Sequence, residues 1–253
     1  MPEFYIDAQD VKISFKDEVV LKPFSLQIRD GERFVIIGPS GHGKSVLIKT
    51  LAGLLPPPQG KVLVKGKDLY ASAHDEQMAL MKKMGMLFQK NALFDSMTCL
   101  ENVTFPLQQV TDQTPAEINE VARYYLDAVG LNHAIDLYPD EISGGMQKRL
   151  GIARAMALKP EILFYDDPTA GLDPITSRKI VQLIIDLNHE NHSTVVLITN
   201  DMNRAFQIAD RIAMVVQKEI VITGDELETK EHADERVSQF VHGRLAGPLQ
   251  VVE

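Results

Sequence analysis

The sequence predicts an α/β fold in which parallel strands are joined by crossover helices, with β-rich material at the N-terminus and a helical insertion in the middle. Three observations lead to this prediction. A glycine-rich loop at 38–45 stands between an apolar strand and a helix, and residues 92–158 are mostly helical in pattern. Apolar strands at 161–165 and 193–199 flank a helical segment at 174–190.

The N-terminal elements are predicted to be short strands around the glycine-rich loop. VKISF (11–15) and FSLQI (24–28) are followed by the turn signal RDG (29–31), and ERFVII (32–37) is a buried strand that ends in the loop. The remaining elements are a helix over VLIKTLAGLL (46–55), stopped by Pro56–Pro58, and a strand and turn over GKVLVKGKDL (60–69).

Two capping boxes mark helix starts in the insertion. Thr98 is followed three residues later by Glu101, and Thr114 by Glu117, with Pro115 at the favoured first helical position. The second helix then shows apolar residues at helical spacing, Ile118, Val121, Tyr125 and Val129, and is closed by Gly130.

The C-terminal part returns to strands. RIAMVVQKEIVITG (211–224) is predicted to be a hairpin that turns near Lys218 and Glu219. The tail from residue 231 is charged and then weakly helical.

The amino-acid composition limits the partners and the cellular compartment that we expect for the protein. The chain has 253 residues and a net charge of −9, from 26 basic and 35 acidic residues. An acidic chain argues against nucleic acid as the main partner, because surfaces that follow phosphate backbones are usually basic. The single Cys99 indicates a reducing compartment. We expect no secretory signal and no membrane span, since no apolar run approaches about 18 residues.

GPSGHGKS, from Gly38 to Ser45, matches the phosphate-loop pattern G-x-x-x-x-G-K-[ST]. Gly41 and Gly43 allow backbone angles that turn successive N–H groups toward an anion, and the helix that follows adds its positive end. Lys44 would reach the β- and γ-phosphates, and the Ser45 hydroxyl would ligate Mg²⁺. A chance glycine-rich turn is the alternative, but the strand before and the helix after are the context that the motif requires.

Two adjacent carboxylates, Asp166 and Asp167, end the strand ILFY. A phosphate loop with Mg²⁺ calls for a strand-end aspartate to hold the metal, and Asp166 fits that role. Asp167 would then act on the attacking water as a base or orienting group. Its alternative role is to cap the following turn.

EISGGMQKRLGIARAMALKP (141–160) contains Ser143, Gly144 and Gly145 at the start of a helix. The N–H groups and the hydroxyl there would form a second phosphate-binding helix terminus. An ordinary serine-capped helix would explain Ser143 but not the two glycines.

With these motifs in this order, the chain resembles the nucleotide-binding subunits of ABC transporters from about residue 6 to 225. Further matches are Gln89 after the strand MGMLF, AGLD ending at Asp173, and Asn200–Asp201 after a later strand. The resemblance implies an ABC ATPase fold, with a RecA-like core, an N-terminal antiparallel β subdomain and an inserted helical signature subdomain. It places the ATPase domain at 1–230, in which 1–91 and 159–230 form the β subdomain and core and 92–158 the signature subdomain.

The same resemblance implies ATP and Mg²⁺ as cofactors and assigns site residues. Gln89 would touch Mg²⁺ and the water, and Phe15 would stack on adenine, although a core phenylalanine is the alternative there. It also implies a head-to-tail homodimer, in which the signature residues bind the partner's nucleotide and Asp173 lies at the dimer seam. The nucleotide-binding residues would be Phe15, Gly38, Pro39, Ser40, Gly41, His42, Gly43, Lys44, Ser45 and Val46; the signature residues would be Ser143, Gly144, Gly145 and Met146.

Finer features are similar to the ATPases of MCE-associated (Mla-type) lipid transport systems. They are Met146 in place of the usual glutamine, the segments LFQKNALFDSMTCLENVTFPL and GLDPITS, and the tail ERVSQFVHGRLAGPL. This branch implies transport of phospholipids or other lipids, with a membrane permease, an MCE-domain protein and sometimes a STAS-domain protein as partners. The ATPase would sit at the cytoplasmic face of the inner membrane, and its extension 231–253 would be a dimer contact.

Two positions depart from the family pattern, which usually has glutamate at Asp167 and histidine at Asn200. Aspartate retracts the carboxylate by one methylene, and a misplacement of about 1 Å can cost about a hundredfold in rate. Asn200 can donate one hydrogen bond but cannot become charged. The chain would therefore hydrolyse ATP slowly or in a tighter closed site, act as an ATP-dependent clamp or regulator, or rely on another subunit for catalysis. We favour the first of these because the carboxylate is kept.

Rival functions stay open at this stage. A soluble translation or repair ATPase of the family usually carries a second cassette or a long coiled-coil insertion, and 253 residues hold neither. A small-solute importer or a peptide exporter is the rival within the transporters.

Overall fold

The computed structural model describes residues 4–16 and 18–249. The chain divides into two compact units, residues 1–77 with 194–253 and residues 78–193. This division by contacts falls at other positions than the predicted boundaries at 91 and 158, because it groups strands and a helix of the core with the helical insertion. The predicted functional subdivision into core and signature subdomain stays a prediction.

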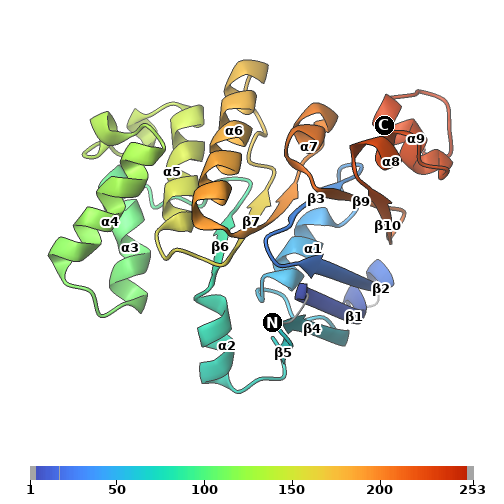
Figure 1. The fold of residues 1–253 in the computed structure, drawn as a ribbon, viewed down its shortest axis with the longest axis horizontal. Coiled ribbons are helices and arrows are strands. Elements are labelled where there is room, and N and C mark those ends of the chain that lie inside the picture. The colour runs from blue at the N-terminus through green and yellow to red at the C-terminus, as the bar shows by residue number, and fades with distance from the viewer. Residues whose placement is uncertain (1–3, 17, 250–253) are drawn as a thin grey trace. The chain divides into compact units, whose positions relative to one another are not determined.

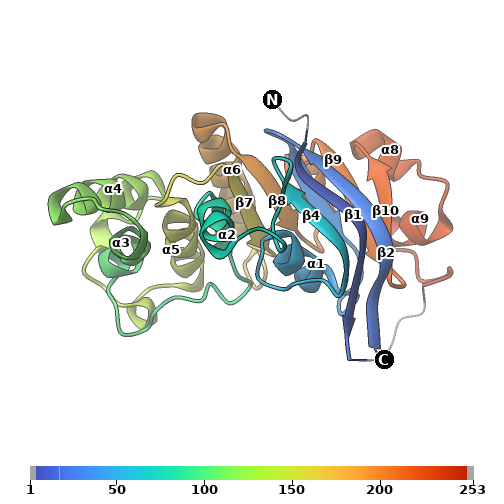
Figure 2. The ribbon, with the colours of Figure 1, turned by 90° about the horizontal axis from the view of Figure 1, so that it is seen from below.

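The first unit contains two sheets (Figures 1 and 2). The antiparallel sheet has the strand order β2-β1-β4-β5, and in the other sheet β10, β9, β3 and β8 follow one another. The predicted parallel strands are confirmed, since β3 pairs in parallel with both β8 and β9. The strands of this unit are β1 (Phe4–Phe15), β2 (Glu18–Arg29), β3 (Arg33–Ile37), β4 (Gln59–Val64), β5 (Lys67–Asp68), β8 (Thr194–Ile198), β9 (Arg211–Val216) and β10 (Glu219–Gly224).

The strand β3 that leads into the phosphate loop is buried, as is its neighbour β8. Val35 and Ile36 of β3 and Val195 and Val196 of β8 are fully buried, as expected of strands covered on both faces. The predicted hairpin at 211–224 is also confirmed, because β9 and β10 pair in antiparallel fashion around a turn at Gln217 and Lys218.

Helix α1 (Lys44–Leu51) ends earlier than the sequence predicts. Gly53, with φ of 82°, follows the C-cap, and the N–H of Leu54 donates to the Lys49 carbonyl at 2.9 Å. This is a Schellman end, in which a left-handed glycine satisfies the last carbonyls of the helix. The prediction that Pro56–Pro58 stop the helix was therefore wrong, because the glycine acts three residues sooner.

The second unit combines a parallel strand pair with a group of packed helices (Figure 1). Both predicted capping boxes are confirmed, at Thr98–Glu101 and at Thr114–Glu117 with Pro115 at the first turn. The elements are β6 (Met84–Leu87), α3 (Cys99–Val110), α4 (Pro115–Ala128), α5 (Gly144–Met156), β7 (Ile162–Asp166) and α6 (Pro174–Asn191), with short 3₁₀ turns at Asn132–Ala134 and Pro139–Glu141.

Helix α2 (His74–Met81) was not predicted from the sequence. Only Leu80 of its eight residues is buried. A helix that buries one side chain leaves almost no apolar periodicity, which is the main sequence signal for a helix.

The C-terminal segment forms two helices that pack beside the β9–β10 hairpin, α8 (Glu226–Lys230) and α9 (Glu235–His242). Buried Gln239 holds the chain after α9 in place, because its amide donates to the carbonyls of Arg244 at 3.2 Å and Leu249 at 3.1 Å and accepts from the Leu249 N–H at 2.7 Å. The predicted dimer contact at 231–253 stays a prediction, and its last residues, 250–253, lie outside the described residues. Within the ranges that the structure describes, no helix is both long and apolar enough to cross a bilayer.

Replacing Thr98 with alanine is expected to lower the free energy of unfolding by about 1 kcal/mol. Thr98 Oγ1 accepts from the Glu101 N–H at 3.2 Å, and the Glu101 carboxylate accepts from the Thr98 N–H at 2.8 Å, so alanine removes half of the box. Urea unfolding followed by far-UV circular dichroism measures the change. Thr98→Ser is the matched control because it keeps the hydroxyl, and equal losses in both variants would contradict the capping role.

Candidate nucleotide-binding and hydrolysis site

The phosphate loop leaves β3 and ends at helix α1. Its glycines Gly38, Gly41 and Gly43 have φ values of 135°, 78° and 97°, in the region that side chains rarely adopt. A Cβ on Gly38 would lie 2.2 Å from the Val215 carbonyl oxygen, so no other residue fits there. The loop therefore turns as the motif predicts, with Ser40 exposed, Pro39 half-buried and Ser45 in the first turn of α1.

Lys44 lies inside this loop. Its ammonium donates to the carbonyls of Gly38 at 2.7 Å and Pro39 at 2.8 Å, and its side chain is 7% exposed. The loop thus wraps a buried cation at the positive end of a helix, which is an arrangement that attracts phosphate.

His42 joins the loop to the β9–β10 turn. The Gln217 N–H donates to His42 Nδ1 at 3.2 Å, which places the ring proton on Nε2. Burial and, second, the Lys44 ammonium lower the pKa of His42, so the ring is neutral at pH 7. Gln217 also accepts from the Arg236 guanidinium of α9 at 3.3 Å. A chain of hydrogen-bonded groups therefore runs from the C-terminal segment to the loop.

Phe15 is the last residue of β1, and its ring is 47% exposed. The core alternative for Phe15 fits poorly with that exposure, because a large apolar side chain on the surface is available to a ligand. Its stacking role stays a prediction.

The two carboxylates after the ILFY strand differ in their surroundings. Asp166 closes β7 and is 5% exposed, whereas Asp167 is half-buried and has φ of 49°. Aspartate is one of the few residues with a side chain that tolerates this left-handed conformation. The Asp167 carbonyl also accepts from the Ala170 N–H at 3.2 Å. The main chain of Asp167 therefore closes the following turn, which was the alternative role considered for its side chain.

Gln89 and Asn200 both follow strands, as predicted. Gln89 is exposed two residues after β6, and Asn200 is exposed two residues after β8. Asp201, beside Asn200, caps α7 (Met202–Ile208) by accepting from the N–H groups of Asn203 and Arg204. The proposed catalytic roles of Gln89 and Asn200 stay predictions.

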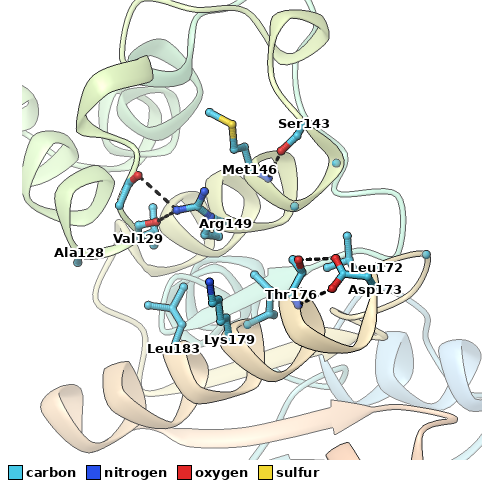
Figure 3. A pocket seen from close by; sticks show the side chains of 15 residues that line it. Ala128, Val129, Ser143, Met146, Arg149, Leu172, Asp173, Thr176, Lys179 and Leu183 are labelled. Carbon is cyan, nitrogen blue, oxygen red and sulfur yellow. Dashed lines mark hydrogen bonds between the residues drawn. The ribbon is translucent and has the colours of Figure 1, made fainter.

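The signature residues open a pocket of about 680 Å³ in the second unit (Figure 3). Ser143 caps α5 by accepting from the Met146 N–H at 3.3 Å, as the sequence predicts. Asp173, on the opposite wall, caps α6 through the N–H groups of Ile175 and Thr176. The Thr176 hydroxyl also donates to the Asp173 carboxylate, and this bond, followed by those from the N–H groups, lowers the pKa of Asp173. The remaining residues that line the pocket are Ala128, Val129, Gly130, Gly144, Gly145, Met146, Arg149, Gly171, Leu172, Thr176, Lys179, Ile180 and Leu183.

Sequence reasoning missed one buried cation. Lys148 of α5 is 5% exposed, and its amine donates to the Gln89 carbonyl at 2.5 Å. The signal was a lysine three residues before Gly151 in the helix QKRLGIA, at a spacing that places the two on neighbouring positions of one face. That spacing shows which residues share a face of the helix, but it does not show which residues elsewhere in the chain they contact.

A phosphate loop after a buried parallel strand, a strand-end aspartate and a serine-glycine helix start define a phosphate-loop nucleotide hydrolase. The family described as "ABC transporter" matches residues 21–170, more than half of the chain. The chain belongs to this family, as an ATP-binding subunit with ATPase activity.

Relatives match nearly the whole chain. A probable ribonucleotide transport ATP-binding protein of Mycobacterium leprae is 37% identical over 98% of this chain and 72% of that protein. An intermembrane phospholipid transport ATP-binding protein, MlaF, of Haemophilus influenzae is 34% identical over 99% of this chain and 95% of that protein.

A solved structure supports the fold. A dimeric ATP-binding cassette in a post-hydrolysis state, bound to ADP and Pi, superposes with a TM-score of 0.79 and 34% identity, over 85% of this chain and 96% of that chain. The predicted ABC ATPase fold and the predicted ATPase activity are thus confirmed.

Proposed function

We propose that this chain powers the transport of phospholipids or other lipids across a cell envelope, as the ATP-hydrolysing subunit of a multi-component transporter. The observation that carries the proposal is the match to the Haemophilus phospholipid transport protein, which extends over 250 residues. That length takes the match into the C-terminal segment after residue 231, beyond the cassette.

The residues of the site divide the work of hydrolysis. Lys44 and the N–H groups of the phosphate loop bind the β- and γ-phosphates, and Phe15 stacks on adenine. Asp167 takes or orients the proton of the attacking water, and Asn200 donates to the γ-phosphate.

Mg²⁺ fits the donor set. Ser45, Gln89 and Asp166 offer hydroxyl, amide and carboxylate oxygens, which are the ligands that this hard cation takes. When bound, Mg²⁺ neutralises charge on the β- and γ-phosphates.

The assembly we propose is a head-to-tail homodimer attached to a permease at the cytoplasmic face of the inner membrane. Ser143 and the glycines after it would bind the nucleotide of the partner subunit. The free N–H groups at a helix start bind phosphate, and the partner's nucleotide would supply it. An MCE-domain protein would carry lipid on the far side, and a STAS-domain protein is a further partner. The C-terminal segment would contact the partner ATPase.

Ribonucleotide transport is the second candidate, because the Mycobacterium relative carries that description. To separate the two candidates, the chain is co-expressed and copurified with the permease encoded by a neighbouring gene. The complex is reconstituted in phospholipid nanodiscs, and its rate of ATP hydrolysis is measured. The lipid proposal expects ATP hydrolysis that rises when transportable phospholipid is supplied and does not change with added ribonucleoside monophosphates. Stimulation by ribonucleotides alone would overturn it.

A further inference from the structure

Helix α5 lies unusually close to strand β6 and the loop after that strand. A Cβ on Gly151 of α5 would lie 2.4 Å from Leu87 Cδ1, and a Cβ on Gly85 of β6 would lie 2.3 Å from the Ala155 carbonyl oxygen. The contact at Gly85 is with main chain, which cannot move aside, and the contact at Gly151 is with the end of a buried leucine side chain. Glycine at both positions therefore lets the helix press against the strand.

The same helix face carries two cations that hold the loop after β6 by its main chain. Lys148 donates to the Gln89 carbonyl at 2.5 Å. Arg154 donates to the carbonyls of Asn91 and Ala92, both at 2.7 Å. Three carbonyls within four residues of the loop are thus bound to α5, and none of these bonds depends on the loop's side chains.

The loop needs such support because its backbone is strained. Asn91 and Ala92 have φ of 59° and 50°, and alanine tolerates the left-handed region poorly. Asn91 is 7% exposed, and its Oδ1 finds no hydrogen-bond partner among the residues that the structure describes. A loop with these costs would relax to another conformation if its carbonyls were released.

The charge of Lys148 also interacts with the two carboxylates after β7. Burial lowers the pKa of its amine, and the negative charges of Asp167 and, second, Asp166 oppose that effect by favouring the ammonium. For Arg154, burial lowers the pKa of the guanidinium. One buried side chain thus contacts the Gln89 main chain and carries a charge that interacts with the Asp167 carboxylate.

We propose that Lys148 is a positioning residue for hydrolysis, which links the signature helix to Gln89 and to the carboxylate pair. Ser143 caps the start of helix α5, so any shift of the helix when phosphate binds there is carried by the Lys148 amine to the Gln89 carbonyl. Its charge meanwhile offsets the repulsion between Asp166 and Asp167. This inference rests on the proposed roles of Gln89 and Asp167.

The test measures ATP binding and steady-state hydrolysis by the full chain carrying Lys148→Met, Lys148→Gln or Lys148→Arg. We expect Lys148→Met to lower kcat about tenfold or more with the ATP dissociation constant changed less than about twofold, because positioning acts on the reacting geometry. Lys148→Gln, which keeps a hydrogen-bond donor on the side chain, should lose most of the same rate because the charge is gone. Lys148→Arg should restore most of it.

Arg154→Met is the matched control, because it removes two loop contacts without removing the Lys148 charge that interacts with the carboxylates. We expect a smaller loss of kcat than in Lys148→Met. The proposal is overturned if Lys148→Met keeps the parent kcat, if Lys148→Gln and Lys148→Arg behave alike, or if kcat and ATP affinity fall together in all variants. If the parent itself hydrolyses no ATP, the proposed assignment of the site fails instead.

Discussion

Asp167→Asn is expected to lower kcat by about a hundredfold or more, while the affinity for ATP changes less than about twofold. The amide keeps the size of the side chain but cannot accept the proton of the attacking water. The substitution is clean because Asp167 has φ of 49°, a conformation that asparagine tolerates as well as aspartate does. Single-turnover hydrolysis and equilibrium binding of ATP measure the two quantities separately.

Asp127→Asn is the control, because it makes the same chemical change on the exposed surface of α4. It should leave both quantities unchanged. If Asp167→Asn hydrolyses ATP as fast as the parent, Asp167 is not the catalytic carboxylate, and the proton must go elsewhere.

Asp167→Glu addresses the missing methylene. Glutamate restores the reach that most of the family has, but it must adopt the left-handed backbone that suits aspartate better. A large gain in kcat would show that reach limits the rate. An unchanged or lower kcat would show that the site is built around the shorter side chain.

Lys44→Ala is expected to weaken ATP binding by about 10- to 100-fold and to abolish turnover, since a hydrogen bond to a charged group contributes about 1.5–3 kcal/mol. The lysine is buried at the start of α1, where no other side chain of the loop carries a full charge. Isothermal titration with ATP measures the loss.

Lys49→Ala serves as the matched control, because Lys49 lies in the last turn of the same helix. Any general effect of removing a lysine from α1 would appear in both variants. Equal ATP affinities for Lys44→Ala and the parent would exclude the phosphate-binding role.

The sequence was informative where a local rule sets the structure. The capping boxes at Thr98 and Thr114, the hairpin turn beside Lys218 and the glycine loop before Lys44 each follow from residues within a few positions of one another. The same holds for the strand that ends at Asp166, because an apolar run that stops at a carboxylate shows both its burial and its end.

It was uninformative where contacts are made over long distances in the chain or where two signals compete. Gly53 ended α1 before the prolines could, and α2 buries too little to leave a pattern. The Lys148 contact joins residues 59 positions apart, and it depends on how closely Gly151 lets α5 approach β6. No periodicity encodes such a contact.

The cap of helix α5 has a consequence for how two subunits would recognise each other. Because the Ser143 oxygen accepts from the Met146 N–H, its rotation is restrained and its proton is directed away from the helix. A hydroxyl restrained in this way loses little rotational entropy when it donates its proton to an arriving acceptor. The direction of the serine proton is therefore set inside each subunit before any partner approaches, so the helix start offers an arriving anion a hydroxyl donor beside its N–H groups.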